Sequence, residues 1–104
     1  MSTLHDVQIE VGRQIARDYG GQLWSPIKTM FHLGLAEEAG EVAGLMKRVL
    51  RNFPQDQTRI TRENFIDEMG DVLWYLAACC IAHDTTLEEV WTHNINKLKE
   101  RYGE

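Results

Sequence analysis

Hydrophobic residues recur every three or four positions along most of this chain, which is the spacing of an amphipathic helix. The first segment is the clearest case, because Leu4, Val7, Val11, Ile15 and Tyr19 follow one another at this interval. No stretch alternates with the two-residue period of a β-strand. The pattern therefore predicts an all-α protein, built as an antiparallel bundle of about four helices.

Capping signals divide the chain into these four helices. Thr3 and Asp6 resemble an N-terminal capping arrangement, and Gly20 is a typical C-terminal stop. Pro26 stands at a favoured first helical position, and Gly103 follows the last helix. A polar segment at 52–61 is expected to be a loop, whereas the short link before the last helix predicts an antiparallel neighbour. The helices are expected at Leu4 to Tyr19, Ser25 to about Arg51, about Arg62 to His83, and Thr86 to about Tyr102.

The length of 104 residues predicts a single domain, 1–104, because two separate cores would each be very small. The longest apolar run, Val72 to Ala82, is about half of what a membrane-spanning helix requires, so no membrane association is expected. The first residues lack the basic and apolar regions of a secretory signal, which predicts a cytoplasmic protein. Cys79 and Cys80 are adjacent in an apolar run and are interpreted as small buried side chains.

Sixteen acidic residues stand against eleven basic ones, giving a formal net charge of −5. This balance argues against a broad basic surface for a nucleic-acid polymer. Six of the sixteen acidic residues lie in two short clusters, Glu37 to Glu41 and Asp67 to Asp71. Charge distribution therefore singles out two places on the chain.

Glu38 and Glu41 lie three residues apart on one helix, and Glu68 and Asp71 repeat this spacing on the next. Each pair shares a helix face, and like charges at this spacing destabilise a helix. Apolar residues flank both pairs, so the four carboxylates are expected to border the core. Such an all-oxygen set suits a hard divalent cation such as Mg²⁺, with Mn²⁺ as a substitute. Small residues near the acids are expected to let the helices approach closely: Gly34, Gly40, Gly44 and Gly70.

Two other interpretations of the acids differ from a Mg²⁺ site. The first is a solvated helix face without a ligand, which is the ordinary role of isolated acidic pairs. The second is a di-iron carboxylate site, which needs a histidine three residues after a glutamate. No glutamate in this chain has one, so iron is set aside.

The acidic residues and their surroundings resemble the MazG-like nucleotide pyrophosphohydrolases, members of the all-α NTP pyrophosphatase superfamily. That family carries E-E-x-x-E followed by E-x-x-D, which here are Glu37 to Glu41 and Glu68 to Asp71. The segments LGLAEEAGEVAGL, DEMGDVLWYLAA and LEEVWTHNINKLKERY extend the similarity over most of the chain after Ser25. The resemblance implies cleavage of a nucleoside triphosphate between its α and β phosphates, with a nucleotide-pool house-cleaning role.

The resemblance also implies roles for individual acids. Glu38, Glu41, Glu68 and Asp71 would hold Mg²⁺, and a carboxylate-bound metal can activate water and bind phosphate oxygens. Glu37 and Glu38 are the catalytic candidates, although the position of Glu37 does not separate a water-mediated ligand from a base. Two alternatives stay open: a phosphoribosyl-ATP pyrophosphohydrolase, and a non-catalytic metal-binding helical interaction module.

Candidates for substrate binding come from all parts of the chain. By resemblance, Asn94 and Lys97 would contact the triphosphate, although a solvated helix face explains them as well. Arg48 shares a face with Glu41 and is a weaker phosphate candidate. Tyr75 shares a face with Asp71 and is the preferred sugar or base contact. Further aromatic candidates are Trp24, ahead of the second helix, with Phe31, His32 and Trp74, whereas His5, His83 and His93 are interpreted as surface or helix-end residues.

The apolar stripes on the four helices are expected to supply more hydrophobic surface than one small bundle can cover. A homodimer or homotetramer is therefore expected. The family resemblance implies that neighbouring subunits complete the substrate pocket.

Overall fold

Four α-helices account for the regular structure in the computed structural model, which describes residues 2–20, 25–52 and 61–103. The helices are α1 (Leu4–Tyr19), α2 (Ser25–Asn52), α3 (Arg62–Ala82) and α4 (Leu87–Tyr102). Their order and bounds confirm the all-α fold predicted from the hydrophobic spacing. Most of the predicted loop before α3 lies outside the described residues.

The ends of α1 follow the predicted capping chemistry. The Thr3 hydroxyl accepts a hydrogen bond from the Asp6 backbone N–H, and the Asp6 carboxylate accepts one from the Thr3 N–H. This closed capping box satisfies two backbone donors that the first helical turn leaves unpaired. Gly20 ends the helix at a φ of 67°, a left-handed conformation that glycine adopts without a Cβ penalty. Gly103 ends α4 in the same way, with a φ of 71°.

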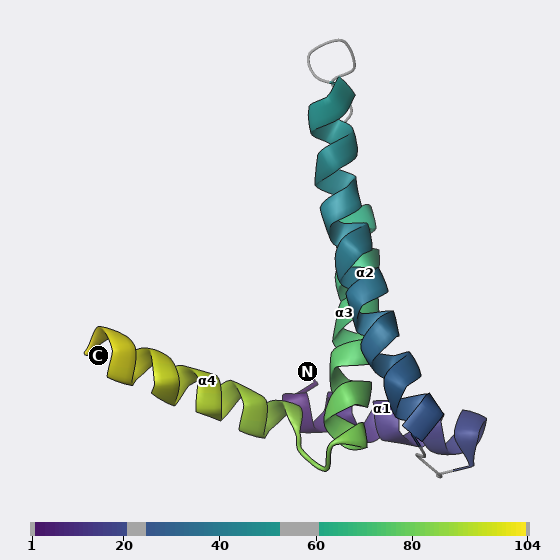
Figure 1. Cartoon of the computed structure of the whole chain (residues 1–104), viewed down its shortest axis with the longest axis vertical. Helices are drawn as coiled ribbons and strands as arrows, with labels where there is room; N and C mark the ends of the chain where they lie inside the picture. Colours follow the sequence, from purple (N-terminus) through teal and green to yellow (C-terminus); the bar gives the residue numbers. More distant parts are fainter. Residues whose placement is uncertain (1, 21–24, 53–60, 104) are drawn as a thin grey trace.

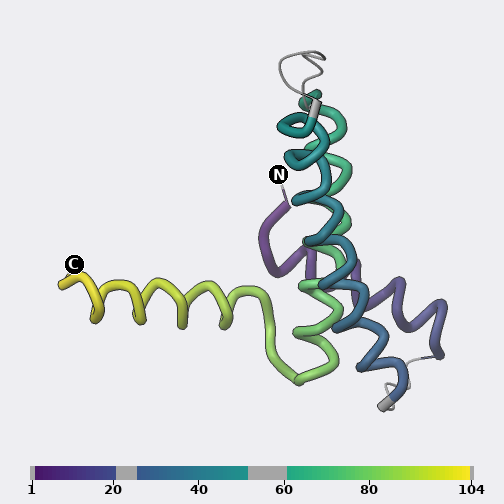
Figure 2. Tube along the Cα trace, turned by 45° about the horizontal axis from the view of Figure 1, so that its top comes forward, coloured from purple at the N-terminus to yellow at the C-terminus, as the bar shows by residue number. Residues whose placement is uncertain are grey.

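The two longest helices, α2 and α3, lie side by side in opposite directions and form an extended hairpin (Figures 1 and 2). α1 crosses the base of this hairpin and packs on the C-terminal half of α3. That half of α3 is rich in alanine and cysteine, and these small side chains let the neighbouring helices approach. The core therefore lies at the base, and its buried side chains are Val11, Ile15, Phe31, Ala77, Ala78, Cys80, Ala82 and Leu87.

Aromatic rings join α1, α2 and α3 at this base. Phe31 is 1% exposed, and its ring meets Tyr19 and Trp74 edge-on at centroid distances of 5.7 and 6.0 Å. Trp74 also donates its indole N–H to Gln14 Oε1 at 2.8 Å. Each aromatic pair adds about 0.5–1.5 kcal/mol beyond the burial of its area. Phe31 therefore serves the core, and its burial argues against the base contact suggested by the sequence. Trp74 is half-buried against the core, so its contact with a base stays a prediction.

Helix α4 leaves the hairpin and extends to one side, contacting α1 and α3 but not α2 among the described residues (Figure 1). The prediction that α4 is an antiparallel neighbour of α3 is therefore wrong. The Gln8 side chain of α1 fixes the intervening chain, because it donates to the Thr85 carbonyl and accepts from the Leu87 N–H. Thr86 caps α4 by accepting from the Glu89 N–H, while the Glu89 carboxylate accepts from the Thr85 hydroxyl. These contacts set the direction of α4.

Cys79 and Cys80 are both free, with Cys80 buried and Cys79 half-buried. Burial raises the pKa of both thiols, so they remain protonated at neutral pH. Among the described helices, none is long and apolar enough to span a membrane.

Candidate active site

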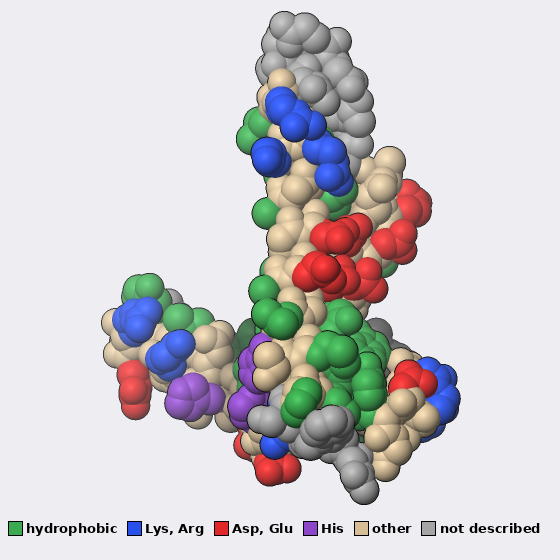
Figure 3. Space-filling model, turned by 45° about the vertical axis from the view of Figure 1, so that its right-hand side comes forward, with side chains coloured by type: hydrophobic (Ala, Val, Ile, Leu, Met, Phe, Trp, Pro, Cys, Tyr) green, Lys and Arg blue, Asp and Glu red, His purple; other side chains and the backbone are tan. Residues whose placement is uncertain are grey.

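The acidic residues of α2 and α3 meet on one side of the hairpin, above the core. Figure 3 shows their carboxylates gathered over the two helices, with basic side chains further toward the far end of the hairpin. One carboxylate oxygen from each of Glu38, Glu41 and Glu68 lies within 4.8 Å of the other two. The i, i+3 spacing on α2 thus places Glu38 and Glu41 close to Glu68 of α3.

The carboxyl groups of this cluster repel one another. The pKa of Glu38 is raised from its ordinary value, first by desolvation and next by the charge of Asp71. The pKa of Glu68 is raised by desolvation and then by the charges of Glu41 and Asp71. Asp71 therefore lies close enough to act on both, although it is outside the group of three closest acids. Glu37 also contributes to the raised pKa of Glu38, which places it at the edge of the cluster.

The expectation that the acids border the core holds for one acid of each pair. Glu38 and Glu68 are half-buried, whereas Glu41 and Asp71 are exposed. This arrangement presents a concentrated negative charge to solvent with partly desolvated oxygens beneath it. Among the described residues, it is the one group of acids, histidines or cysteines close enough to hold a metal ion through three side chains. The donor set fits the hard, oxygen-binding cation that the sequence predicted.

Arg48 lies within electrostatic reach of the cluster, because its positive charge lowers the pKa of Glu68 against the effect of the neighbouring acids. It is exposed and stands on α2, seven residues after Glu41. A guanidinium group at the edge of a carboxylate site can bind the phosphate of a metal-bound ligand through two parallel hydrogen bonds. Arg48 therefore acts electrostatically on Glu68, and its role in substrate binding stays a prediction.

Tyr75 also belongs to the neighbourhood of the acids. Desolvation raises the pKa of its phenol, and the charge of Glu38 raises it further. Its ring packs directly against the backbone of α2 at Gly34, which is buried. The hydroxyl therefore stays protonated beside the carboxylates and can donate a hydrogen bond. Trp74 contacts it edge-on at 5.1 Å and helps to fix the ring.

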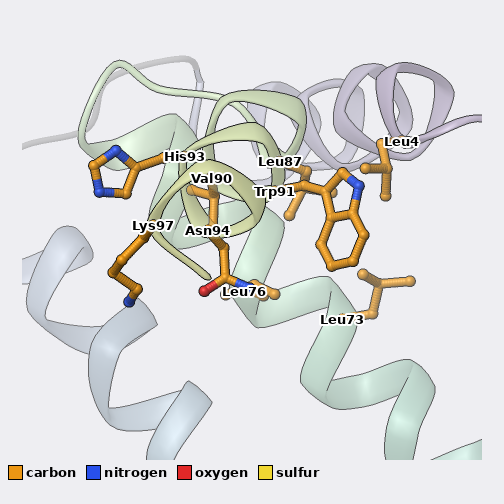
Figure 4. Close-up of a pocket in the computed structure, with 9 residues that line it drawn as sticks. All are labelled: Leu4, Leu73, Leu76, Leu87, Val90, Trp91, His93, Asn94 and Lys97. Atoms are coloured by element: carbon orange, nitrogen blue, oxygen red, sulfur yellow. The ribbon is translucent and has the colours of Figure 1, made fainter. Parts of the chain in front are cut away.

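Asn94 and Lys97 lie elsewhere. Both line a pocket of ≈ 340 Å³ in the angle between α3 and α4, together with apolar side chains of both helices (Figure 4). Leu73 and Leu76 are the α3 residues of this pocket, and helical periodicity puts them on a different face from Glu68 and Asp71. Within one chain, the structure does not bring Asn94 and Lys97 to the acidic cluster.

The glycines near the acids differ from the expectation. Only Gly34 has the predicted packing role, because a side chain there would meet the Tyr75 ring. Gly40 and Gly70 face open space, and Gly44 is approached only by the flexible end of Arg48. Close helix contact at Gly40, Gly44 and Gly70 was therefore predicted wrongly. Trp24, the other aromatic candidate, lies outside the described residues.

The sequence did not predict that two histidine side chains, those of His32 and His83, lie in contact. His32 and His83 are 51 positions apart, yet their Nε2 atoms are 2.9 Å from each other. His83 was expected at a helix end, and it follows α3 directly. No local spacing signals the pair, because its two members come together only through the packing of α2 on α3.

The fold and the acidic cluster together define an all-α protein with three carboxylates, close enough to hold a metal ion, between two antiparallel helices. Comparison with known proteins gives the family. The chain belongs to the MazG nucleotide pyrophosphohydrolase domain family, whose sequence model matches residues 28–104. This match covers all the acids of the cluster, Glu37, Glu38, Glu41, Glu68 and Asp71.

Two relatives are similar over a large part of the chain. The Gene 37 protein of Mycobacterium phage L5 is 39% identical over 69 residues, which span 66% of this chain and 60% of the phage protein. The crystal structure of YPJD from Bacillus subtilis, a protein assigned as a pyrophosphatase, is 28% identical. It superposes with a TM-score of 0.69 and covers 97% of both chains. The similarity to YPJD includes the fold as a whole.

Proposed function

We propose that this protein hydrolyses nucleoside or deoxynucleoside triphosphates between the α and β phosphates, releasing the monophosphate and pyrophosphate. The observation that carries the proposal is the convergence of Glu38, Glu41 and Glu68 from two helices of a MazG-type domain. Three carboxylates so close together are unfavourable unless a cation compensates their charge. A polyphosphate substrate is the natural ligand for a cation held in this way.

Mg²⁺ is the proposed cofactor, with Mn²⁺ as a substitute, and Glu38, Glu41, Glu68 and Asp71 would hold it. Their oxygens match the preference of these hard ions. The raised pKa values of Glu38 and Glu68 reflect first their desolvation and then the negative charge of the neighbouring acids. When bound, the ion supplies positive charge for phosphate oxygens and lowers the pKa of a coordinated water.

Individual residues of the chain carry out the proton transfer and bind the substrate. Glu37 lies at the edge of the cluster and accepts the proton of the attacking water, whose oxygen forms the new bond to phosphorus as pyrophosphate leaves. Glu38 holds the cation and orients this proton transfer. Arg48 binds a phosphate oxygen, and the Tyr75 hydroxyl donates a hydrogen bond to the sugar or base. Trp24 is proposed as a stacking contact for the base. Glu37, Glu38 and Arg48 lie on α2 and Tyr75 lies on α3, so these two helices would position the substrate.

We further propose that the protein works as a homodimer or homotetramer. The radius of gyration is 16.8 Å, compared with about 13 Å for a compact domain of this length. Helix α3 also carries a stripe of large apolar side chains that are between 38% and 47% exposed, namely Phe65, Ile66, Met69 and Leu73. A second copy of the chain would cover this stripe, and its α4 would supply Asn94 and Lys97 to the acidic cluster.

The test is incubation of the purified protein with Mg²⁺ and a panel of canonical and modified nucleoside triphosphates, with products resolved by chromatography. We expect monophosphate and pyrophosphate in equal amounts, and no reaction in EDTA or with the Glu41→Gln variant. Release of diphosphate and phosphate would refute cleavage at the α–β bond. Cleavage of phosphoribosyl-ATP alone would instead assign the histidine-pathway substrate, and folded protein without turnover on any nucleotide would assign an interaction module.

A further inference from the structure

His32 and His83 form a pair of exposed imidazoles at the base of the hairpin, apart from the acidic cluster. His32 stands in α2, and His83 is the residue that follows α3. Their rings meet edge-on, with centroids 4.9 Å apart and planes at 74°, and their Nε2 atoms are 2.9 Å apart. Figure 3 shows histidine side chains open to solvent on this side of the molecule. Two imidazole nitrogens, one from α2 and one from the residue that follows α3, are thus already side by side.

The hydrogen bond on the other side of the His32 ring assigns its proton. Nδ1 of His32 is 2.7 Å from the carbonyl oxygen of Lys28, one helical turn earlier. A carbonyl oxygen only accepts, so Nδ1 carries the hydrogen and the neutral ring keeps its lone pair on Nε2. Metal-binding histidines typically have this arrangement, in which a backbone carbonyl fixes the tautomer and the ring orientation. His32 is therefore pre-oriented as an Nε2 ligand.

We propose that His32 and His83 bind a borderline divalent transition-metal ion through their two Nε2 atoms. Without the ion, the Nε2–H of His83 donates to the lone pair of His32. With the ion, His83 carries its proton on Nδ1 instead, and both Nε2 lone pairs bind the metal. Water molecules complete the coordination, as expected for a site with two protein ligands.

The separation of the nitrogens indicates which ions fit. Metal–nitrogen distances are about 2.1 Å, so two nitrogens near 2.9 Å apart occupy adjacent corners at roughly a right angle. Right-angle positions are those of octahedral or square-planar ions such as Ni²⁺ and Cu²⁺, whereas tetrahedral Zn²⁺ needs the pair to open slightly. Imidazole nitrogen also suits these ions better than Mg²⁺. The histidine pair and the acidic cluster thus select different classes of metal.

A bound ion would link α2 to the chain that leads from α3 into α4. His83 immediately precedes the segment that Gln8 holds through Thr85 and Leu87. Cross-linking at this point favours the folded arrangement, because the ion binds only when both rings are together. Ion binding should therefore raise the melting temperature independently of the acidic cluster.

The experiment is calorimetric titration of NiCl₂ into the chain without a histidine tag, with excess Mg²⁺ in both solutions to occupy the carboxylates. We expect one Ni²⁺ per chain and a rise in melting temperature. His32→Gln and His83→Gln should each weaken Ni²⁺ binding at least about tenfold and abolish the thermal shift. His5→Gln, which removes an exposed histidine of α1, should change neither, and Glu41→Gln should retain the site while removing nucleotide turnover.

Nuclear magnetic resonance of the imidazole nitrogens provides a second measurement on the unaltered chain. Before Ni²⁺ is added, His32 should carry its proton on Nδ1 and His83 on Nε2; diamagnetic Zn²⁺ should then shift the Nε2 signals of both rings. Ni²⁺ binding that survives in both histidine variants, or the absence of any binding to the wild-type chain under Mg²⁺, would overturn the proposal. Because its readout is Ni²⁺ or Zn²⁺ binding, its failure is distinct from a failure of the proposed hydrolase activity.

Discussion

The ring of Tyr75 occupies the space that a side chain at Gly34 would fill. A methyl group on Gly34 would lie 2.2 Å from Cε1 of Tyr75, well inside van der Waals contact. This contact sets the distance between α2 and α3 one turn below the first acidic pair. The missing side chain of Gly34 therefore helps to position Tyr75 and the carboxylates of both helices.

The first prediction concerns this contact. Gly34→Ala should destabilise the protein by about 1–2 kcal/mol, because overpacking costs about 1–3 kcal/mol and the gain in helix propensity offsets up to about 1 kcal/mol. Gly40→Ala on the same helix faces open space, so it should stabilise the protein by up to about 1 kcal/mol. Urea unfolding of the two variants gives the comparison. Equal stabilisation by both changes would show that the ring moves aside freely.

The second prediction separates the stability of the acidic cluster from its activity. Glu41→Gln removes a negative charge that acts on Glu68 and Glu38. In EDTA, the variant should melt at a higher temperature than the wild type, because one source of repulsion is gone. Its turnover should fall by more than about a hundredfold, since a metal ligand contributes several kcal/mol to the transition state. Full activity of the variant would reject Glu41 as a ligand.

The third prediction concerns pH in the absence of metal. The pKa values of Glu38 and Glu68 lie above their ordinary value of 4.5 in the folded protein. The folded state therefore binds more protons than the unfolded chain, and stability should rise as the pH falls from neutral toward 4.5. The opposite holds for Glu10, whose pKa is lowered to about 2 by its hydrogen bonds to Arg13 and Gln14. Its contribution is present above pH 4.5 and is lost between 4.5 and about 2.

Melting temperatures measured across this range in EDTA test the assignment. In the wild type, the melting temperature should rise as the pH falls from neutral toward 4.5, because Glu38 and Glu68 take up protons there. The double variant Glu38→Gln, Glu68→Gln lacks both carboxyl groups and should lose this rise. Glu10→Gln should lose part of the decrease in melting temperature below pH 4.5 and leave the melting temperatures above pH 4.5 unchanged. If the melting temperatures of the double variant and the wild type differ by the same amount at every pH above 4.5, Glu38 and Glu68 do not have raised pKa values.

Local chemistry made much of this fold predictable. Thr3 with Asp6, and Gly20, are caps whose partners lie within one turn, so the sequence alone locates α1. The direction of α4 depends instead on Gln8, whose bonds to Thr85 and Leu87 cross more than seventy positions of the chain. No periodic pattern records such a contact.

Some features of the site could likewise be predicted from local spacing, whereas others depend on how the helices pack. Glu38, Glu41, Glu68 and Asp71 repeat one helical spacing, and this repetition predicted a cluster that the structure brings together. The exposed positions of Gly40 and Gly70 and the pairing of His32 with His83 follow from the packing of α2 on α3. Those features required the relative rotation of the two helices, which helix periodicity does not fix.

The fourth prediction tests Arg48 as a phosphate ligand. Arg48→Ala should lower kcat/KM by about 10- to 100-fold, chiefly through KM, because a hydrogen bond to a charged group contributes about 1.5–3 kcal/mol. Arg51→Ala is the matched control, since it removes an exposed arginine three residues later on α2. Arg48→Lys should recover part of the loss by keeping the charge without the two-point geometry. Similar kinetics for the two alanine variants would assign Arg48 to general surface charge.

The fifth prediction concerns the separation of Lys97 from the acidic cluster. Lys97 lines the pocket between α3 and α4, and no contact joins α4 to α2 among the described residues. If α4 serves the cluster of a partner copy, the Lys97→Ala and Glu41→Gln chains should each be poorly active alone. A mixed dimer would then contain one site with both changes and one intact site. Equal mixing with free exchange should restore about a quarter of wild-type activity, because half of the dimers are mixed.

The control for this experiment is an equal mixture of Glu38→Gln and Glu41→Gln chains. Both changes fall in the same cluster, so every site of the mixed dimer carries one of them and no activity should return. Sedimentation equilibrium on each mixture establishes that dimers form. Dimers without recovery in the Lys97→Ala mixture would show that Lys97 acts within its own chain or not at all. A monomer at micromolar concentration would refute the shared site, because the exposed stripe on α3 would then have no partner copy to cover it.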